Sequence, residues 1–240
     1  MTPAIAHHPL HRADGSATYS NNLYSVLAAA NGPVEVQRRD ELPEEAAIEV
    51  NVRPLSGIGG PRERWLESVL AAVLKSILLV HMHPRTLVQV TLQITKAPTV
   101  RVGGTVNDVS LLPSLVNAAF LAVVDAGLPL DSTVTAILLS ASSTGEVLEQ
   151  QSEKQLASSK RVHAFAYNHR AEMLLNESAG DFTWSEWEEV ADKAEKMCSR
   201  AMVPMTGDEQ MANGTAESSP WLRLELEQRA QAAVAWRDPT

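Results

Sequence analysis

The fold is decided by the stretch Asn117-Ala118-Ala119-Phe120-Leu121-Ala122-Val123-Val124-Asp125-Ala126-Gly127-Leu128-Pro129-Leu130. It is apolar on nearly every side of a helix, which is typical of a core helix rather than a surface helix. Gly127 stands where a left-handed C-cap is favoured, and Pro129 follows where a helix cannot resume. The stretch therefore predicts a buried helix that stops at Gly127.

On both sides of this helix, residue patterns predict an alternation of strands and helices. Alternating Val88, Val90, Leu92 and Ile94 predict a half-buried strand, and Thr183 with Glu186 forms a capping box for a long amphipathic helix. The expected strands are 17–30, 34–38, 46–52, 86–95, 133–140, 146–150, 161–167 and 173–176, and the expected helices are 61–80, one that Asp108 or Ser110 caps, 183–202 and 221–236. Mixed sheets with layered helices, an α+β fold, follow from this order.

The sequence also predicts a turn and a division of the chain into segments. Asn31-Gly32 between two strand-like segments predicts a hairpin turn. Residues 1–202 form the expected main domain, with 1–15 as an irregular arm; 203–220 form a low-complexity loop that we expect to be disordered, and 221–240 carry a final helix of the same domain.

Composition narrows the class of protein. The chain has 240 residues, 45% of them hydrophobic, and a net charge of −9. It lacks the overall basic charge of a freestanding nucleic-acid binder, so any RNA contact must come from a local basic patch. Cys198 is the only cysteine, which fits a reducing compartment. Residues 1–12 carry no apolar signal segment, and no apolar run reaches about 18 residues.

Several short motifs occur together in a specific order. They are Asp14-Gly15-Ser16-Ala17, Asn31-Gly32-Pro33-Val34-Glu35-Val36, Arg62-Glu63-Arg64, His83-Pro84-Arg85 and Asn117 to Leu130. On these motifs the chain, from about Leu10 to Met202, resembles the RNase PH-like subunits of the RNA exosome core, and most closely a fungal type. The resemblance implies an RNase PH-like fold (ribosomal protein S5 domain 2-like).

The resemblance also sets a chemical question, because that family contains phosphate-dependent ribonucleases and inactive relatives. Active members place Gly-Thr-Arg just before the core helix, where free amides and a cation bind phosphate. We expect that junction at Asp108 to Pro113, which has no Arg; Gly103-Gly104-Thr105, followed by Val106, is expected to be a loop turn.

A second requirement for activity is an acid that protonates the leaving oxygen. Active relatives carry an Asp-rich stretch, whereas the comparable stretch here, Glu146 to Glu153, contains no Asp. Glu149 or Glu153 could serve chemically, but solvated surface carboxylates are the more common case. No catalytic residue is therefore assigned, and the chain is expected not to be an enzyme.

Candidate RNA-binding residues are Arg62 and Arg64, because the family carries basic residues facing the RNA path at this helix start. The alternative is a solvated pair with Glu63 and Glu67 as local ion-pair partners. His81 and His83 lack the further ligands of a metal site, so neither a metal nor a cofactor is expected. Trp184 and Trp187 are expected in the core or a subunit interface, and Cys198 as a small buried hydrophobe.

The leading hypothesis is a non-catalytic structural subunit of the exosome ring, supporting 3′-to-5′ RNA processing and degradation, rRNA maturation included. Implied partners are other RNase PH-like subunits in a hexameric ring, S1 and KH cap subunits, a hydrolytic nuclease and RNA in the channel, with no membrane. The implied location is the nucleus, nucleolus included, and the cytoplasm. Alternatives are an active phosphate-dependent 3′-5′ exoribonuclease and a self-associating α+β domain without an RNA role.

Overall fold

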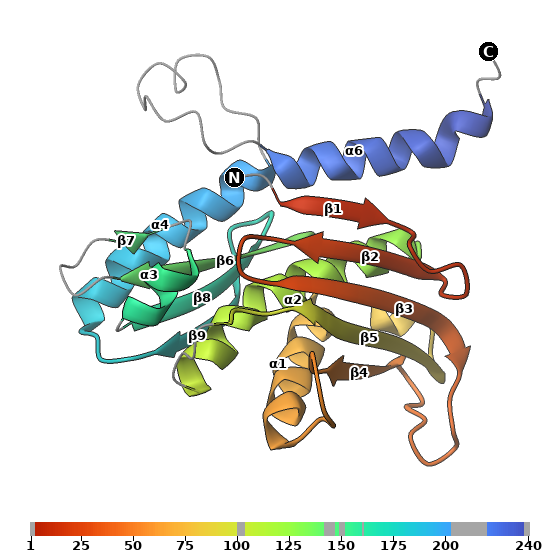
Figure 1. Ribbon diagram of the computed structural model, residues 1–240. Coiled ribbons are helices and arrows are strands. Elements are labelled where there is room, and N and C mark those ends of the chain that lie inside the picture. Colours follow the sequence, from red (N-terminus) through yellow and green to blue (C-terminus); the bar gives the residue numbers. More distant parts are fainter. Residues whose placement is uncertain are drawn as a thin grey trace.

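Two β-sheets and the helix between them organise the chain (Figure 1). The computed structural model describes residues 3–99, 104–141, 147–148, 152–159, 161–202 and 220–237. The first sheet has the order β1-β2-β3-β5-β4, and the second has the order β7-β6-β8-β9. Strand β4 runs parallel to β5, and the other neighbouring strands are antiparallel. The expected α+β fold with mixed sheets is confirmed.

The described elements follow the expected alternation. The strands are β1 Ala4–His7, β2 Gly15–Ser20, β3 Ser25–Glu35, β4 Ala47–Arg53, β5 Thr86–Lys96, β6 Val134–Ala141, β7 Val147–Leu148, β8 Arg161–Asn168 and β9 Met173–Ala179. The helices are α1 Pro61–Ile77, η1 Val80–Met82, α2 Gly104–Asp125, α3 Glu153–Ser158, α4 Trp184–Met202, α6 Trp221–Val234 and η2 Ala235–Arg237. The fold therefore has the alternation that the patterns predict, with shifted element boundaries and two short elements, β1 and α3, that the patterns do not predict.

Helix α2 is the centre of the hydrophobic core. It packs against β2 and β3 of one sheet and against β6 and β8 of the other. Every residue from Val109 to Val123 is buried, as the apolar character of the stretch predicts. By length and composition α2 could cross a membrane, but protein surrounds it on nearly all sides. Its apolar surface therefore serves to join the two sheets.

The end of α2 matches the prediction from Gly127. Gly127 has φ +69°, its N–H donates to the carbonyl of Val124 (3.0 Å), and the N–H of Leu128 donates to the carbonyl of Val123 (3.3 Å). These two bonds are the Schellman pattern, in which a left-handed residue closes a helix.

The start of α2 differs from the prediction. The helix begins at Gly104, upstream of the expected caps Asp108 and Ser110, and Pro113 lies inside it. A proline within a helix costs roughly 3 kcal/mol. Burying side chains such as Val109 and Leu111 stabilises by about 1.5–3 kcal/mol each, which offsets that cost.

Two further expectations in the first sheet are wrong. The β2–β3 turn lies at residues 21–24, where Asn21 Oδ1 accepts from the N–H groups of Leu23 (2.9 Å) and Tyr24 (2.7 Å). Asn31-Gly32 instead lies within β3, at a register shift opposite β5. The arm at 1–15 is not irregular throughout, because Ala4–His7 pairs with β2 as an edge strand.

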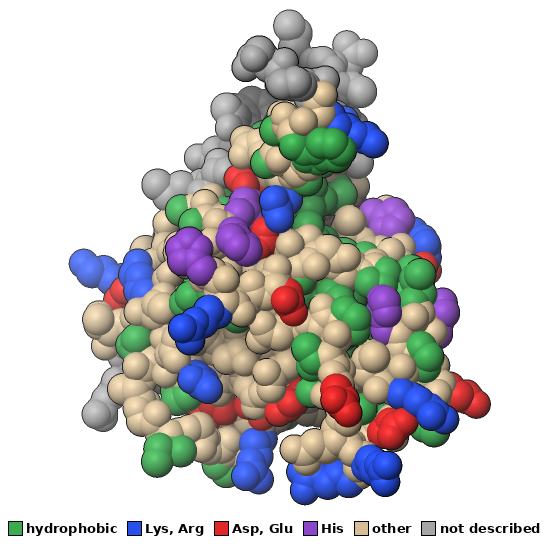
Figure 2. Space-filling view, turned by 90° about the vertical axis from the view of Figure 1, so that its right-hand side faces the viewer, with side chains coloured by type: hydrophobic (Ala, Val, Ile, Leu, Met, Phe, Trp, Pro, Cys, Tyr) green, Lys and Arg blue, Asp and Glu red, His purple; other side chains and the backbone are tan. Residues whose placement is uncertain are grey.

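The C-terminal helix α6 is attached at one end only. Leu222 is fully buried, and the Trp221 ring lies 5.9 Å from the ring of Tyr19. Residues 231–237 are exposed, and this half projects beyond the sheets (Figure 1). Figure 2 shows hydrophobic side chains at the projecting end, above a face on which charges of both signs are interleaved. The expected disordered loop at 203–220 lies outside the described residues, apart from Pro220.

Candidate functional site

The first turns of α1 and α2 meet through an ion pair that joins Arg62 Nε to Asp108 Oδ1. The Arg62 side chain is 39% exposed and that of Asp108 is 21% exposed, so the pair lies at the surface with one side against the protein. Arg64, the second candidate RNA-binding residue, is exposed. The structure therefore separates the two arginines: Arg62 is held by α2, and Arg64 faces solvent.

The expected local ion pairs of these arginines are not formed within the described part of the chain. Glu63 Oε2 instead accepts from the N–H of Gly60 (2.7 Å), as the capping box of α1, and Glu67 Oε1 accepts from the N–H of Val52 (2.9 Å). Both carboxylates satisfy backbone donors that would otherwise lack a partner. The expectation that Glu63 and Glu67 neutralise the arginines is thus wrong.

A buried hydroxyl cluster supports the start of α2. The Tyr24 hydroxyl lies 2.6 Å from Ser110 Oγ and 2.9 Å from Asn107 Oδ1. Burial raises the pKa of Tyr24 to about 12, so its hydroxyl remains protonated at neutral pH and can donate. The cluster thus ties the first turns of α2 to the beginning of β3.

A pocket of about 360 Å³ opens beside this cluster. It is lined by Trp65, Thr105, Asp108, Val109 and the segment Glu177–Gly180. Burial raises the pKa of Glu177 above its usual value. None of the described lining residues is basic, and Arg62, which contacts the lining residue Asp108, is engaged by that carboxylate. Among the residues that the structure describes here, an anion would therefore meet two carboxylates, Asp108 and Glu177.

The expected phosphate junction at Asp108 to Pro113 is therefore misplaced. Because α2 begins at Gly104, Gly104-Thr105-Val106 occupies its first turn, and Gly103 lies outside the described residues. Thr105 lines the pocket, whereas the partly buried Val106 packs against the hydrophobic core. The segment that we expected to be a loop turn is the true helix start, and an apolar side chain follows its threonine.

Of the two candidate acids, Glu149 and Glu153, the structure describes only Glu153. Glu149 lies outside the described residues. Glu153 Oε2 accepts from Thr99 Oγ1 (2.9 Å) and from the Thr99 N–H (3.3 Å), and Glu153 is not part of the pocket lining. The structure thus does not bring Glu153 together with the start of α2.

Three other residue types can be placed. Cys198 is buried, its Sγ donates to the carbonyl of Thr135 (3.3 Å), and burial raises its pKa to about 12, so the thiol stays protonated. Trp187 packs against Phe165, as expected for the core. Trp184 is 73% exposed and so is not a core residue of this chain, and the interface that we gave as the other expectation for it stays a prediction. Among the described residues His81 and His83 belong to no group of three or more metal-binding side chains.

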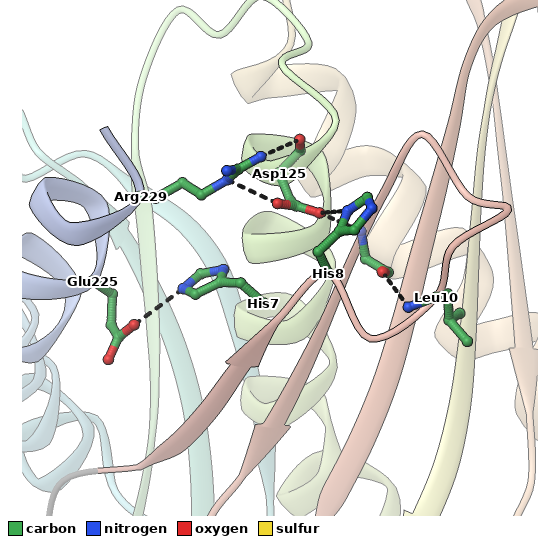
Figure 3. A network of polar contacts seen from close by, with 7 residues as sticks. His7, His8, Leu10, Asp125, Glu225 and Arg229 are labelled. Atoms are coloured by element: carbon green, nitrogen blue, oxygen red, sulfur yellow. Dashed lines mark hydrogen bonds and ion pairs between the residues drawn. The ribbon is translucent and has the colours of Figure 1, made fainter. Parts of the chain in front are cut away.

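A second polar cluster lies at the other end of α2 (Figure 3). The fully buried carboxylate of Asp125 accepts from the Ser16 N–H (2.9 Å) and lies 2.9 Å from His8 Nδ1. It also forms an ion pair with Arg229, whose Nε lies 2.8 Å from Asp125 Oδ1. Burial alone would raise the pKa of Asp125, but these donors outweigh burial and hold it below its usual value. His7 pairs in the same region with Glu225 (3.0 Å). The cluster attaches the N-terminal strand and α6 to the core helix.

Sequence reasoning did not identify Tyr24, Trp65 and Glu177 as site residues. Tyr24 directly precedes β3, Trp65 lies in α1 and Glu177 lies in β9. No local motif marks them, because the pocket forms only when α1, α2 and β9 meet. Asp108 was predicted as a possible helix cap, but its pairing with Arg62 joins positions far apart in the sequence, which no local motif marks.

Comparisons with known proteins agree on one family. Residues 4–129 match the model of the 3′ exoribonuclease family, domain 1 (RNase PH). The chain is 33% identical over 198 residues to exosome complex component RRP46 of Saccharomyces cerevisiae, covering 79% of this chain and 86% of that protein. It is 40% identical over 153 residues to the exosome complex exonuclease RRP46 homolog of Oryza sativa, covering 62% of this chain and 60% of that one.

Solved structures give the same picture. The crystal structure of rice Rrp46 superposes with a TM-score of 0.70 at 28% identity, covering 89% of this chain and 95% of that one. A subunit of the Archaeoglobus fulgidus exosome with RNA bound to the active site superposes with a TM-score of 0.64 at 14% identity, covering 82% and 85%. The latter similarity concerns the fold alone.

Proposed function

The chain belongs to the RNase PH family of 3′ exoribonucleases, and on this premise we propose that it is a non-catalytic subunit of an exosome ring. In this role it supports 3′-to-5′ RNA processing and degradation by helping to build the channel through which RNA reaches a separate nuclease.

Similarity along nearly the whole chain supports the place in a ring. The yeast relative is named as a component of the exosome complex, and the match covers most of both proteins. The rice Rrp46 structure has the same fold over 95% of its length. Neighbours in the proposed assembly are other RNase PH-like subunits, with S1 and KH cap subunits above the ring and a hydrolytic nuclease as its outlet.

The lack of catalysis rests on one observation, the first turn of α2. Active members of the family carry Gly-Thr-Arg there, and this chain carries Gly104-Thr105-Val106, with Val106 against the core. Without that arginine, the described part of the helix N-terminus offers amides but no cation of its own to hold phosphate beside the terminal phosphodiester. Arg62 does not replace it, because Asp108 occupies the guanidinium.

RNA contact in the proposed channel falls mainly to Arg64. Its exposed guanidinium can reach a backbone phosphate, a contact that positions RNA without reading its sequence. Arg62 can contribute only if its pairing with Asp108 loosens. We also propose that the protein acts in the nucleus, nucleolus included, and in the cytoplasm, which imaging of the tagged chain in intact cells tests.

A phosphorolysis assay tests the catalytic part of this proposal. Single-stranded RNA is incubated with the purified chain, with and without inorganic phosphate, beside a phosphorolytic exoribonuclease as positive control. The proposal predicts no phosphate-dependent release of nucleoside diphosphates. Release that Glu149→Gln or Glu153→Gln abolishes would establish the alternative, an active phosphate-dependent exoribonuclease.

A further inference from the structure

The segment from Glu177 to Glu189 combines acidic and aromatic side chains. Its sequence is Glu-Ser-Ala-Gly-Asp-Phe-Thr-Trp-Ser-Glu-Trp-Glu-Glu, without a Lys, Arg or His. It covers the end of β9, the following turn and the first turns of α4. Five carboxylates and three aromatic rings are thus presented within a short length of chain.

The aromatic rings of this segment are exposed and held in place. Trp184 is 73% exposed and Phe182 is 39% exposed. The Trp184 ring stacks on Trp187 at 5.0 Å, and Trp187 is fixed by Phe165 at 6.0 Å. The Nε1 of Trp187 also donates to Asn176 Oδ1 (3.2 Å). Because the supporting ring is anchored, Trp184 can bind a partner with little loss of side-chain entropy.

Most carboxylates of the segment have no cation partner of their own. Glu186 is the exception: it pairs with Arg161 (2.5 Å) and caps the backbone N–H of Thr183 (2.8 Å). In the part of the chain that the structure describes, no ion pair involves Glu177, Asp181, Glu188 or Glu189. Glu177 and Gly180 also line the pocket next to Trp65, so the acidic and aromatic character continues into that pocket.

We propose that this acidic aromatic surface, residues 177–189 with the adjoining Trp65, binds an Arg- or Lys-rich segment of a partner protein. Cations are attracted to the face of Trp more strongly than to other rings, and a guanidinium can also pair with a carboxylate. The chain holds an internal example, since Arg237 lies over the ring of Trp236 at 5.5 Å.

Nucleic acid fits the same surface poorly. Exposed aromatic rings can stack on bases, but single-strand binders combine them with a basic groove along the backbone. Here the segment's own charges are negative and Arg161 is paired with Glu186, so the remaining carboxylates would repel phosphates. Charge therefore favours a basic protein segment over RNA, and this argument does not depend on the proposed ring assembly.

Binding of a fluorescent Arg-Gly repeat peptide to the full chain tests the proposal by anisotropy at physiological ionic strength. We expect saturable binding that Trp184→Ala weakens roughly three- to tenfold, with a similar loss in the double variant Glu188→Gln/Glu189→Gln. Two controls match these variants. Trp236→Ala removes another exposed tryptophan, and Asp192→Asn/Glu195→Gln neutralises two exposed carboxylates farther along α4.

The controls separate a built surface from general attraction to an acidic protein. The proposal predicts that both control variants bind the peptide like the wild type. It is overturned if the peptide does not bind, or if the controls weaken binding as much as the test variants. Oligouridine binding that Trp184→Ala abolishes would also overturn it, because the surface would then be one for RNA.

Discussion

Asp108 determines what Arg62 can bind. The carboxylate pairs with the guanidinium at the start of α2, so one of the two candidate RNA-binding arginines is paired within the chain. The pair is partly exposed, and such pairs contribute little to stability, at most about 1 kcal/mol. Its main effect is therefore on binding rather than on folding.

Replacing Asp108 with Asn should release Arg62. We expect single-stranded RNA to bind roughly two- to fivefold more tightly at low salt. The slope of the logarithm of the binding constant against the logarithm of the salt concentration should become steeper by about 0.7, which corresponds to one additional phosphate contact. Anisotropy titrations with labelled oligouridine at several salt concentrations measure both. Asp131→Asn, which frees Arg170 elsewhere, is the matched control. An equal gain in that variant would show that only net charge matters.

Asp125 is a buried charge that contributes to stability. Its carboxylate faces Arg229, His8 and the Ser16 N–H, and because Arg229 and His8 remain partly in water, losing these charge-assisted contacts costs about 1.5–3 kcal/mol. We expect a loss of this size in the free energy of unfolding for Asp125→Asn in urea titrations at neutral pH. Glu225→Gln, which breaks the more exposed pair with His7, should cost less than about 1 kcal/mol.

The lowered pKa of the Asp125 carboxylate makes the free energy of unfolding depend on pH. The pKa of Asp125 is lower in the folded protein than in the unfolded chain. Its contribution is therefore complete above the unfolded value of about 3.9 and is lost as the pH falls through the lower folded value. The stability difference between wild type and Asp125→Asn should shrink below about pH 4. A difference that stays constant in acid would contradict the assignment.

Helix α2 carries both the fold and the proposed loss of chemistry. Its end is a Schellman motif around Gly127, where a Cβ would meet no neighbouring atom within 4 Å. A substitution there is therefore opposed only by the left-handed backbone conformation. Its start, by contrast, carries Val106 at the position that the proposed function assigns to the arginine of active relatives.

Gly127→Ala should destabilise the protein by roughly 1–2 kcal/mol, the cost of a left-handed alanine. Gly104→Ala is a matched control, since a Cβ there also meets nothing within 4 Å but the backbone carries no positive φ. That variant should be neutral within about 0.5 kcal/mol. Urea unfolding of both variants measures the contrast, and equal effects would show that the φ of Gly127 is not the cause.

The two ends of α2 also show what the sequence can and cannot predict. The end was predictable because Gly127 and Pro129 act locally. The start was not, because Pro113 resembles a helix breaker and only tertiary burial of Val109 and Leu111 explains why the helix extends past it. Here the burial of apolar side chains outweighs the low helix propensity of proline.

The candidate site was only partly predictable for a related reason. The sequence identifies Arg62 and Arg64 as cations at a helix start. It does not predict that Asp108 forms an ion pair with Arg62, because the two residues are far apart in the sequence. The strand Ala4–His7 was missed because an edge strand forms where β2 offers unpaired backbone groups, a property of the sheet and not of the arm.

On the scale of the whole molecule, two sheets pack on one buried helix to form a single unit, from which half of α6 projects (Figure 1). Attachment of α6 depends on Asp125, Arg229, His7 and Glu225, so the N-terminal strand and the C-terminal helix are linked (Figure 3). In a ring subunit, such a unit contributes shape and surfaces to an assembly. This is the role that the proposed function assigns to the chain.

The native mass of the particle that contains this chain tests the central claim most directly. The tagged chain, 26.0 kDa, is purified from its own cells under mild conditions, and the intact complex is weighed by native mass spectrometry. The account predicts a hetero-oligomer several times heavier than a homodimer, in which other RNase PH-like subunits are identified. A particle with the mass of a monomer or homodimer, free of such subunits, would contradict it.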